Sequence, residues 1–171
     1  MEAENTKTNI PLSLMARKFL DERLPDAIAH HRQEHPRHLS FCGEFYFFYG
    51  SLMDPETLRR VLKLQELPRL FPSKILGYHC MLWGEYPALI DGMLNEPVYG
   101  MAFEVQSPED VTRLENYETK KYENTGCIIQ FEDGTKVAGR TFVWAGDQAE
   151  LKEGRFDLKD WKMDNLERNM Y

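Results

Sequence analysis

An aromatic run at residues 43–50, Gly-Glu-Phe-Tyr-Phe-Phe-Tyr-Gly, limits the fold of this chain more than any other segment. A short aromatic run between two glycines is typical of a fully buried strand. Residues 54–56, Asp-Pro-Glu, follow almost at once and carry the signals of a helix start, namely a capping acceptor, a proline in the first turn and an acidic neighbour. The sequence therefore predicts a buried strand that passes through a tight turn into a capped helix.

Further strands are expected along the chain without strict alternation with helices. Their predicted ranges are 75–83, 98–105, 127–131 and 136–144. The Asp133-Gly134 pair between the last two is a hairpin signal, so these two strands should be antiparallel. This mixture favours an α+β fold over a doubly wound parallel sheet.

Helices are expected in three other places. Residues 107–110, Ser-Pro-Glu-Asp, are close to a capping box and predict a helix that runs to Glu118. A last helix is expected from about Asp157, with Leu158, Trp161 and Leu166 as its apolar positions. Helical spacing of apolar residues before position 40 predicts an N-terminal helical extension at 1–40, followed by the main domain at 41–171.

Length, charge and cysteine content narrow the class of protein. A chain of 171 residues fits one domain with its own core. The net charge of −7 opposes nucleic acid and anionic membranes as general partners, and the most apolar stretch is far shorter than a membrane span. Three cysteines without paired spacing predict buried thiols in a reducing compartment, and the polar, acidic N-terminus predicts no secretory leader. We therefore expect a cytoplasmic protein.

Residues 49–52, Tyr49-Gly50-Ser51-Leu52, are the first candidate for a functional segment, because they join the buried strand to the capped helix. Glycine and a small serine let the backbone approach a ligand, and the N–H groups of such a turn can bind an anion or a carbonyl oxygen. The alternative is a tight connection with no ligand.

Glu118 is the second candidate. It closes the predicted helix in the segment Leu-Glu-Asn-Tyr-Glu at 114–118, so it can lie at the rim of a cavity where loss of water would raise its pKa. The alternative is a surface glutamate that pairs with Lys121. Residues 83–89, Trp-Gly-Glu-Tyr-Pro-Ala-Leu, form a third candidate, which either lines a pocket or belongs to the core and a turn.

In their order and spacing, the Tyr-Gly-Ser-Leu turn, the capped helix, the Tyr-Pro-Ala-Leu segment at 86–89 and the Leu-Glu-x-x-Glu segment resemble the gamma-glutamyl cyclotransferase-like family. That family includes plant avirulence-induced proteins and the deglutamylase of the butirosin pathway. The resemblance covers about residues 45–144. It implies a small, mostly antiparallel mixed β-barrel flanked by helices.

The resemblance also implies roles for individual residues. Glu118 corresponds to the catalytic glutamate, and Tyr122 to a tyrosine that lines the same pocket. Tyr49, Gly50, Ser51 and Leu52 correspond to the loop that holds the gamma-glutamyl group. Two positions depart from the family pattern: Glu115 stands where aspartate is usual, and Thr119 where glycine often follows the catalytic glutamate.

The activity implied is cyclisation of a gamma-glutamyl group to 5-oxoproline, with release of an amine, an amino acid or a peptide such as cysteinylglycine from glutathione. The substrate supplies both reacting groups, so one glutamate and a few backbone N–H donors suffice, with no metal or other cofactor. The partner is then a small gamma-glutamyl molecule. The sequence leaves open the oligomeric state and the identity of the released group.

Three rival kinds of chemistry have weaker support in the sequence. Residues 31–35, His-Arg-Gln-Glu-His, fit the H-x-x-E-H pattern of inverted zinc peptidases, but Pro36 ends the helix at once and the surrounding face is polar. The cysteines lack basic neighbours, and Ser51 lacks the second flanking glycine of a nucleophile elbow. The remaining alternative is a protein of this fold that serves a specialised-metabolite pathway or binds small molecules without catalysis.

Overall fold

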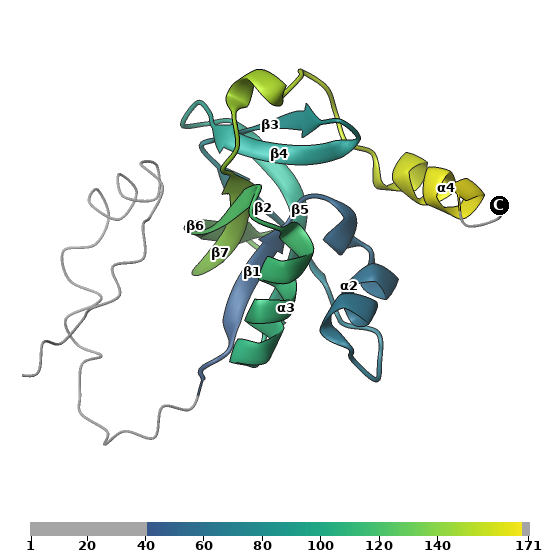
Figure 1. The fold of residues 1–171 in the computed structure, drawn as a ribbon. Coiled ribbons are helices and arrows are strands. Elements are labelled where there is room, and N and C mark those ends of the chain that lie inside the picture. Colours follow the sequence, from purple (N-terminus) through teal and green to yellow (C-terminus); the bar gives the residue numbers. More distant parts are fainter. Residues whose placement is uncertain (1–40, 169–171) are drawn as a thin grey trace, which may run out of the picture.

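The barrel is the centre of the structure, a computed structural model that describes residues 41–168 (Figure 1). Its five strands lie in the closed order β1-β5-β2-β6-β7. Neighbouring strands are antiparallel except β1 and β7, which are parallel and close the barrel. The strands are β1 Glu44–Phe48, β2 Phe71–Leu76, β5 Pro97–Val105, β6 Tyr122–Phe131 and β7 Lys136–Trp144. The predicted α+β mixed barrel flanked by helices is thus confirmed.

The remaining elements surround the barrel (Figure 1). A separate two-stranded antiparallel sheet stands at one end, formed by β3 Tyr78–Trp83 and β4 Tyr86–Asp91. The helices are η1 Ser51–Met53, α2 Pro55–Leu62, α3 Pro108–Glu118, η2 Gln148–Glu150 and α4 Leu158–Arg168.

The aromatic run of β1 is buried because both of its faces are covered. Phe47 and Tyr49 belong to a cluster that joins β1 to β2, β5 and β6, whereas Tyr46 and Phe48 pack with Leu58 of α2 and with α3. Alternate residues of a strand point to opposite faces, so an unbroken aromatic run fits a strand between two apolar layers.

The two helix starts read from the sequence carry the expected caps. The Asp54 side chain accepts a hydrogen bond from the Thr57 N–H at 3.0 Å, and Ser107 accepts one from the Asp110 N–H at 3.2 Å. Each satisfies a backbone donor that has no partner inside the helix. The second helix ends at Glu118, as predicted.

The strand expected at 75–83 is wrong as a single element. Gly77, with φ of 86°, separates two strands in this range. The first, β2, belongs to the barrel, and the second, β3, belongs to the hairpin sheet. The segment at 86–91 was not predicted as a strand, yet it is β4. The hairpin around Gly134 is confirmed, although β6 begins five residues earlier than expected, at Tyr122.

The last helix begins where the sequence placed it, but it lies on the outside of the molecule (Figure 1). None of its residues is buried. Of the apolar positions expected of it, Leu158 and Trp161 are half-buried, whereas Leu166 is 60% exposed. Two ion pairs add to this partial packing: Lys162 pairs with Asp54, and Arg168 with Glu85. No helix between residues 41 and 168 is long and apolar enough to cross a membrane. The predicted extension at 1–40 and the His31–His35 motif lie outside the described residues.

Candidate functional site

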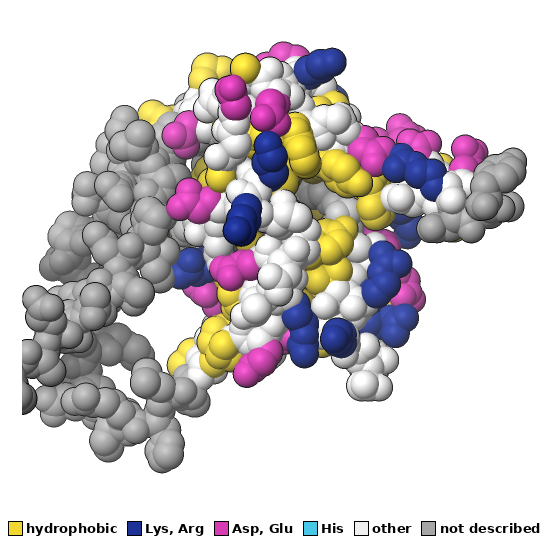
Figure 2. Space-filling model, in the orientation of Figure 1, with side chains coloured by type: hydrophobic (Ala, Val, Ile, Leu, Met, Phe, Trp, Pro, Cys, Tyr) yellow, Lys and Arg dark blue, Asp and Glu magenta, His cyan; other side chains and the backbone are white. Residues whose placement is uncertain are grey.

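A cavity of about 320 Å³ lies between the barrel, the end of α3 and the β3–β4 hairpin. Figure 2 shows hydrophobic side chains on both sides of a hollow in this face of the molecule. The six residues singled out from the sequence all line this one cavity: Tyr49, Gly50, Ser51, Leu52, Glu118 and Tyr122. They come from the end of β1, the turn after it, the end of α3 and the start of β6.

Glu118 is the charged side chain among the lining residues that the structure describes. Its removal from water raises the pKa of the carboxyl from 4.5 to about 7. A carboxyl that titrates near neutral pH can both accept and donate a proton under ordinary conditions.

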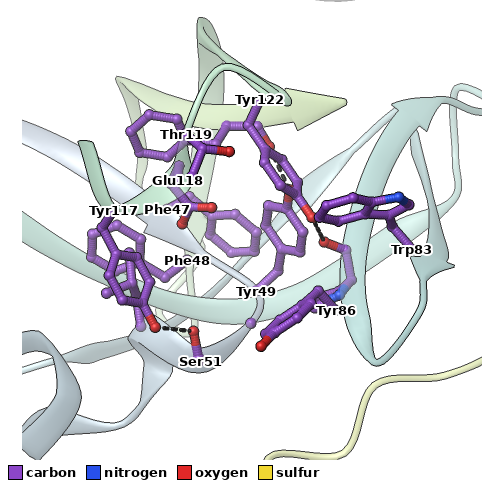
Figure 3. A pocket seen from close by; sticks show the side chains of 14 residues that line it. Phe47, Phe48, Tyr49, Ser51, Trp83, Tyr86, Tyr117, Glu118, Thr119 and Tyr122 are labelled. Atoms are coloured by element: carbon purple, nitrogen blue, oxygen red, sulfur yellow. Dashed lines mark hydrogen bonds between the residues drawn. The ribbon is translucent and has the colours of Figure 1, made fainter. Parts of the chain in front are cut away.

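The turn at Gly50 and Ser51 faces the same cavity. The Gly50 carbonyl accepts from the Met53 N–H at 3.0 Å, and the Ser51 carbonyl from the Asp54 N–H at 3.1 Å. The carbonyls are therefore occupied within the turn, while the first N–H groups of such a helical turn have no partner inside it. The Ser51 hydroxyl lies 2.9 Å from the Tyr117 hydroxyl (Figure 3).

Position 50 leaves no room for a side chain, so it requires glycine. A Cβ at this position would lie 2.8 Å from Cγ of Pro87, so a side chain here would push apart two segments that both line the cavity. The backbone φ of −130° is open to other residues, and the close approach to Pro87 is what favours glycine.

Two tyrosines brace the cavity from within. The Tyr49 hydroxyl donates to the Phe142 carbonyl at 2.5 Å, and the Tyr122 hydroxyl donates to the Pro87 carbonyl at 2.9 Å. Burial raises the pKa of both phenols, and the Glu118 carboxylate adds to the rise. Both remain neutral hydrogen-bond donors that tie β1 to β7 and β6 to the hairpin.

Residues 46–163 match the sequence profile of the family described as gamma-glutamyl cyclotransferase, AIG2-like. The chain belongs to this family. AIG2-like protein D of Arabidopsis thaliana is 26% identical over 125 residues, which cover 71% of this chain and 80% of the relative.

Solved structures share the family fold. A solution structure of an Arabidopsis thaliana protein superposes with a TM-score of 0.57 at 20% identity, covering 81% of each chain. A gamma-glutamyl cyclotransferase superposes with a TM-score of 0.52 at 12% identity, covering 61% of this chain and 68% of the other. At these identities the likeness concerns the fold.

Thr119, one of the two departures from the family pattern, has a backbone that favours glycine. Its φ is 66° and its ψ is −179°, a combination that side chains rarely adopt. The glycine that the resemblance led us to expect here would fit this backbone better than the threonine that this chain holds. The strained residue directly follows Glu118 and also lines the cavity.

Glu115, the other departure, lies outside the cavity of this cyclotransferase-family fold. Its carboxylate accepts a hydrogen bond from the Asn124 side chain at 3.0 Å, in a surface groove between α3 and β6. Its identity therefore affects how α3 packs on β6 and leaves the lining of the cavity unchanged.

Tyr117 is a lining residue that the sequence reasoning missed. It directly precedes Glu118 and is 37% exposed. Its spacing of three from Leu114 places it on the same face of α3, a signal that could have found it. Trp83, Tyr86 and Pro87 also line the cavity, as one of the two interpretations of residues 83–89 had it.

The thiols lie away from this cavity. Burial raises the pKa of Cys80 to about 11 and that of Cys127 further, which keeps both protonated. Cys127 is buried, Cys80 is half-buried and Cys42 is exposed, so the expectation that all three cysteines are buried is right for Cys127 alone. Within residues 41–168, no three His, Cys, Asp or Glu side chains come together as a metal site.

Proposed function

We propose that this chain cyclises a gamma-glutamyl group to 5-oxoproline and releases an amine, an amino acid or a peptide. The observation that carries the proposal is the position of Glu118. Its carboxyl, with a pKa of about 7, lines the same cavity as the turn at residues 50–52. Membership of the cyclotransferase family supports the reaction class.

The proposed mechanism uses Glu118 twice. As a carboxylate it accepts a proton from the substrate's α-ammonium group, and the freed amine attacks the γ-carbonyl carbon. A C–N bond forms, and the carbonyl oxygen gains negative charge that N–H groups of the 50–52 turn stabilise. When the bond to the released nitrogen breaks, the Glu118 carboxyl returns the proton to that nitrogen. The ring nitrogen then gives up its second proton by way of the Glu118 carboxylate to the released amine, which leaves as an ammonium ion. Atoms and charge balance without a cofactor.

The surroundings of Glu118 suit this double use. A carboxyl with a pKa of about 7 is roughly half ionised at neutral pH, so neither step meets a large mismatch in proton affinity. The ring closure is intramolecular, which supplies the proximity that a two-substrate enzyme would have to create. We further propose that the substrate is a small cytoplasmic molecule.

The test is an assay of purified full-length protein against gamma-glutamyl amino acids, gamma-glutamyl amines and glutathione. We expect 5-oxoproline and the released amine in equal amounts from at least one class. With Glu118 as base, kcat/KM should rise as the pH increases through about 7. Tight binding of these compounds without any turnover would identify a non-catalytic binding protein and overturn the proposal.

A further inference from the structure

We propose that the group released from the substrate is a hydrophobic, preferably aromatic amine that carries no carboxylate. The inference rests on the proposed function and concerns the other end of the same cavity. In Figure 3, Glu118, Tyr117 and Ser51 lie on one side of the cavity, and Trp83 and Tyr86 lie on the other. If the gamma-glutamyl group occupies the side with Glu118, the released group faces Trp83 and Tyr86.

Three contacts fix the position of the Trp83 ring. Its ring centroid lies 5.2 Å from that of Trp144, its indole N–H donates to Glu150 at 3.0 Å, and the Lys121 ammonium lies 5.4 Å from its ring centroid. Tyr122 packs edge-on against the same Trp144, with centroids 5.5 Å apart. The indole therefore forms a fixed flat wall, which binds a flat apolar group without first losing conformational freedom.

Tyr86 completes this wall from the opposite strand of the hairpin. Trp83 and Tyr86 are direct cross-strand partners on either side of the tight turn at Gly84 and Glu85. Partners directly opposite in an antiparallel pair project to the same face, so both rings turn towards the cavity. Tyr86 is 41% exposed, so its ring stands at the mouth, where a bound ring can cover it.

The charges beside this wall disfavour a carboxylate on the released group. The charge that the described lining contributes is the carboxyl of Glu118. The cations that contact the hairpin end at Trp83 and Glu85 are both paired, Lys121 with Glu150 at 3.2 Å and Arg168 with Glu85. Lys152 pairs through its backbone with Leu82, whose side chain points to the opposite face of β3 from Trp83. A carboxylate against Trp83 would lose water without gaining a free cation, whereas an apolar amine would gain from burial.

Three matched substrates test the inference through release of 5-oxoproline. Gamma-glutamyl-2-phenylethylamine and gamma-glutamyl-phenylalanine differ by one carboxylate, and gamma-glutamyl-ethylamine lacks the ring. We expect kcat/KM for the phenylethylamine compound to exceed that of each of the other two by at least about tenfold. Equal or faster turnover of the phenylalanine or ethylamine compound overturns the inference and leaves the proposed function standing. No 5-oxoproline from any gamma-glutamyl compound overturns the proposed function itself.

Variants of the wall assign the preference to these residues. Trp83→Ala should lower the ratio of kcat/KM between the phenylethylamine and ethylamine compounds at least about fivefold. Because Trp83 also packs on Trp144, Tyr86→Ala provides a second variant with less risk to the fold, and it should lower the ratio about threefold. Tyr99→Ala is the matched control, since Tyr99 is 70% exposed on β5 outside the cavity lining, and it should leave the ratio unchanged. An unchanged ratio in both wall variants would overturn the assignment.

Discussion

The two walls of the cavity are held in place by different interactions. The polar wall, formed by the turn at 50–52 and the end of α3, sits on the barrel: Leu52 and Leu114 are buried in the cluster beneath it. The aromatic wall belongs to the β3–β4 hairpin, a separate sheet. Tyr78 and Leu89 anchor its far end in the core cluster of the barrel, whereas the end that carries Trp83 packs on the smaller cluster of Trp144 and Leu151. Under the proposed function, the chemistry that needs accurate placement belongs to the wall on the barrel, and contact with the variable part of the substrate belongs to the hairpin.

The largest expected effect tests whether proton transfer in the reaction depends on the polar wall alone. Glu118→Gln keeps the shape of the side chain and removes the titrating proton, so release of 5-oxoproline should fall at least about a hundredfold for every substrate. Glu115→Gln on the same helix is the control and should change the rate little, because Glu115 bonds to Asn124 outside the cavity. Near-normal turnover by the Glu118 variant would remove the glutamate from the mechanism.

The same glutamate should make the fold less stable as pH rises. A folded-state pKa of about 7, against 4.5 when unfolded, means that the folded state binds more protons between these values. The free energy of unfolding should therefore fall by about 3 kcal/mol as pH increases from 4.5 to 7. Glu118→Gln should lack this part of the pH dependence and be the more stable protein at pH 8. Chemical denaturation of both proteins at several pH values measures the difference. Parallel curves would mean that Glu118 is not desolvated.

Gly50 lies where the two walls touch, so its replacement should affect both. Gly50→Val would place a side chain against Pro87 of the hairpin, and we expect a loss of activity of about tenfold or more on folded protein. Ser51→Ala removes one hydroxyl, which contacts Tyr117, and should cost only a few-fold. Thermal denaturation alongside the assay separates loss of fold from loss of function. Loss of activity in the serine variant alone would make serine the chemical participant and contradict the role given to the backbone.

The polar wall could be predicted from the sequence far better than the aromatic one. Local signals mark its two segments, a glycine turn before an Asp-Pro helix start and a glutamate that closes a capped helix, and the resemblance to the family then favoured a functional role for both. The hairpin depends on Gly77 turning the chain out of the barrel, and a single glycine inside an apolar run does not show whether the strand bends or ends. The parallel contact of β1 with β7 joins residues more than ninety apart, and no local pattern encodes it.

Thr119 offers a smaller effect on the polar wall. Thr119→Gly relieves a backbone with a positive φ and should raise the free energy of unfolding by about 1 kcal/mol. This is the net value once the cost of the greater entropy of glycine in the unfolded chain has been subtracted. Thr112→Gly is the matched control: it places the same change inside α3 and should lower stability by about 0.5 kcal/mol. If both variants are destabilised alike, the backbone at Thr119 is not strained.

The smallest expected effect concerns α4, which is bound to both walls. Lys162 bonds to Asp54 at 2.7 Å beside the polar turn, and Arg168 bonds to Glu85 on the hairpin. Although burial opposes the charge on Asp54, its bonds with Lys162 and Thr57 outweigh that cost and keep the pKa below 3.8. The stabilisation from this pair is therefore present at neutral pH and lost as pH falls through that lowered pKa.

A double-mutant cycle of Lys162→Gln and Asp54→Asn measures the pair by itself, because asparagine can still cap α2. Lys162 is 48% exposed, so we expect a coupling of only about 0.5 kcal/mol in low salt, falling towards zero in about 1 M salt. A coupling that does not depend on salt would mean that packing, and not charge, holds α4 against the polar wall. In that case α4 would be a rigid part of the barrel side of the molecule, and Arg168 of α4 would fix the hairpin to it.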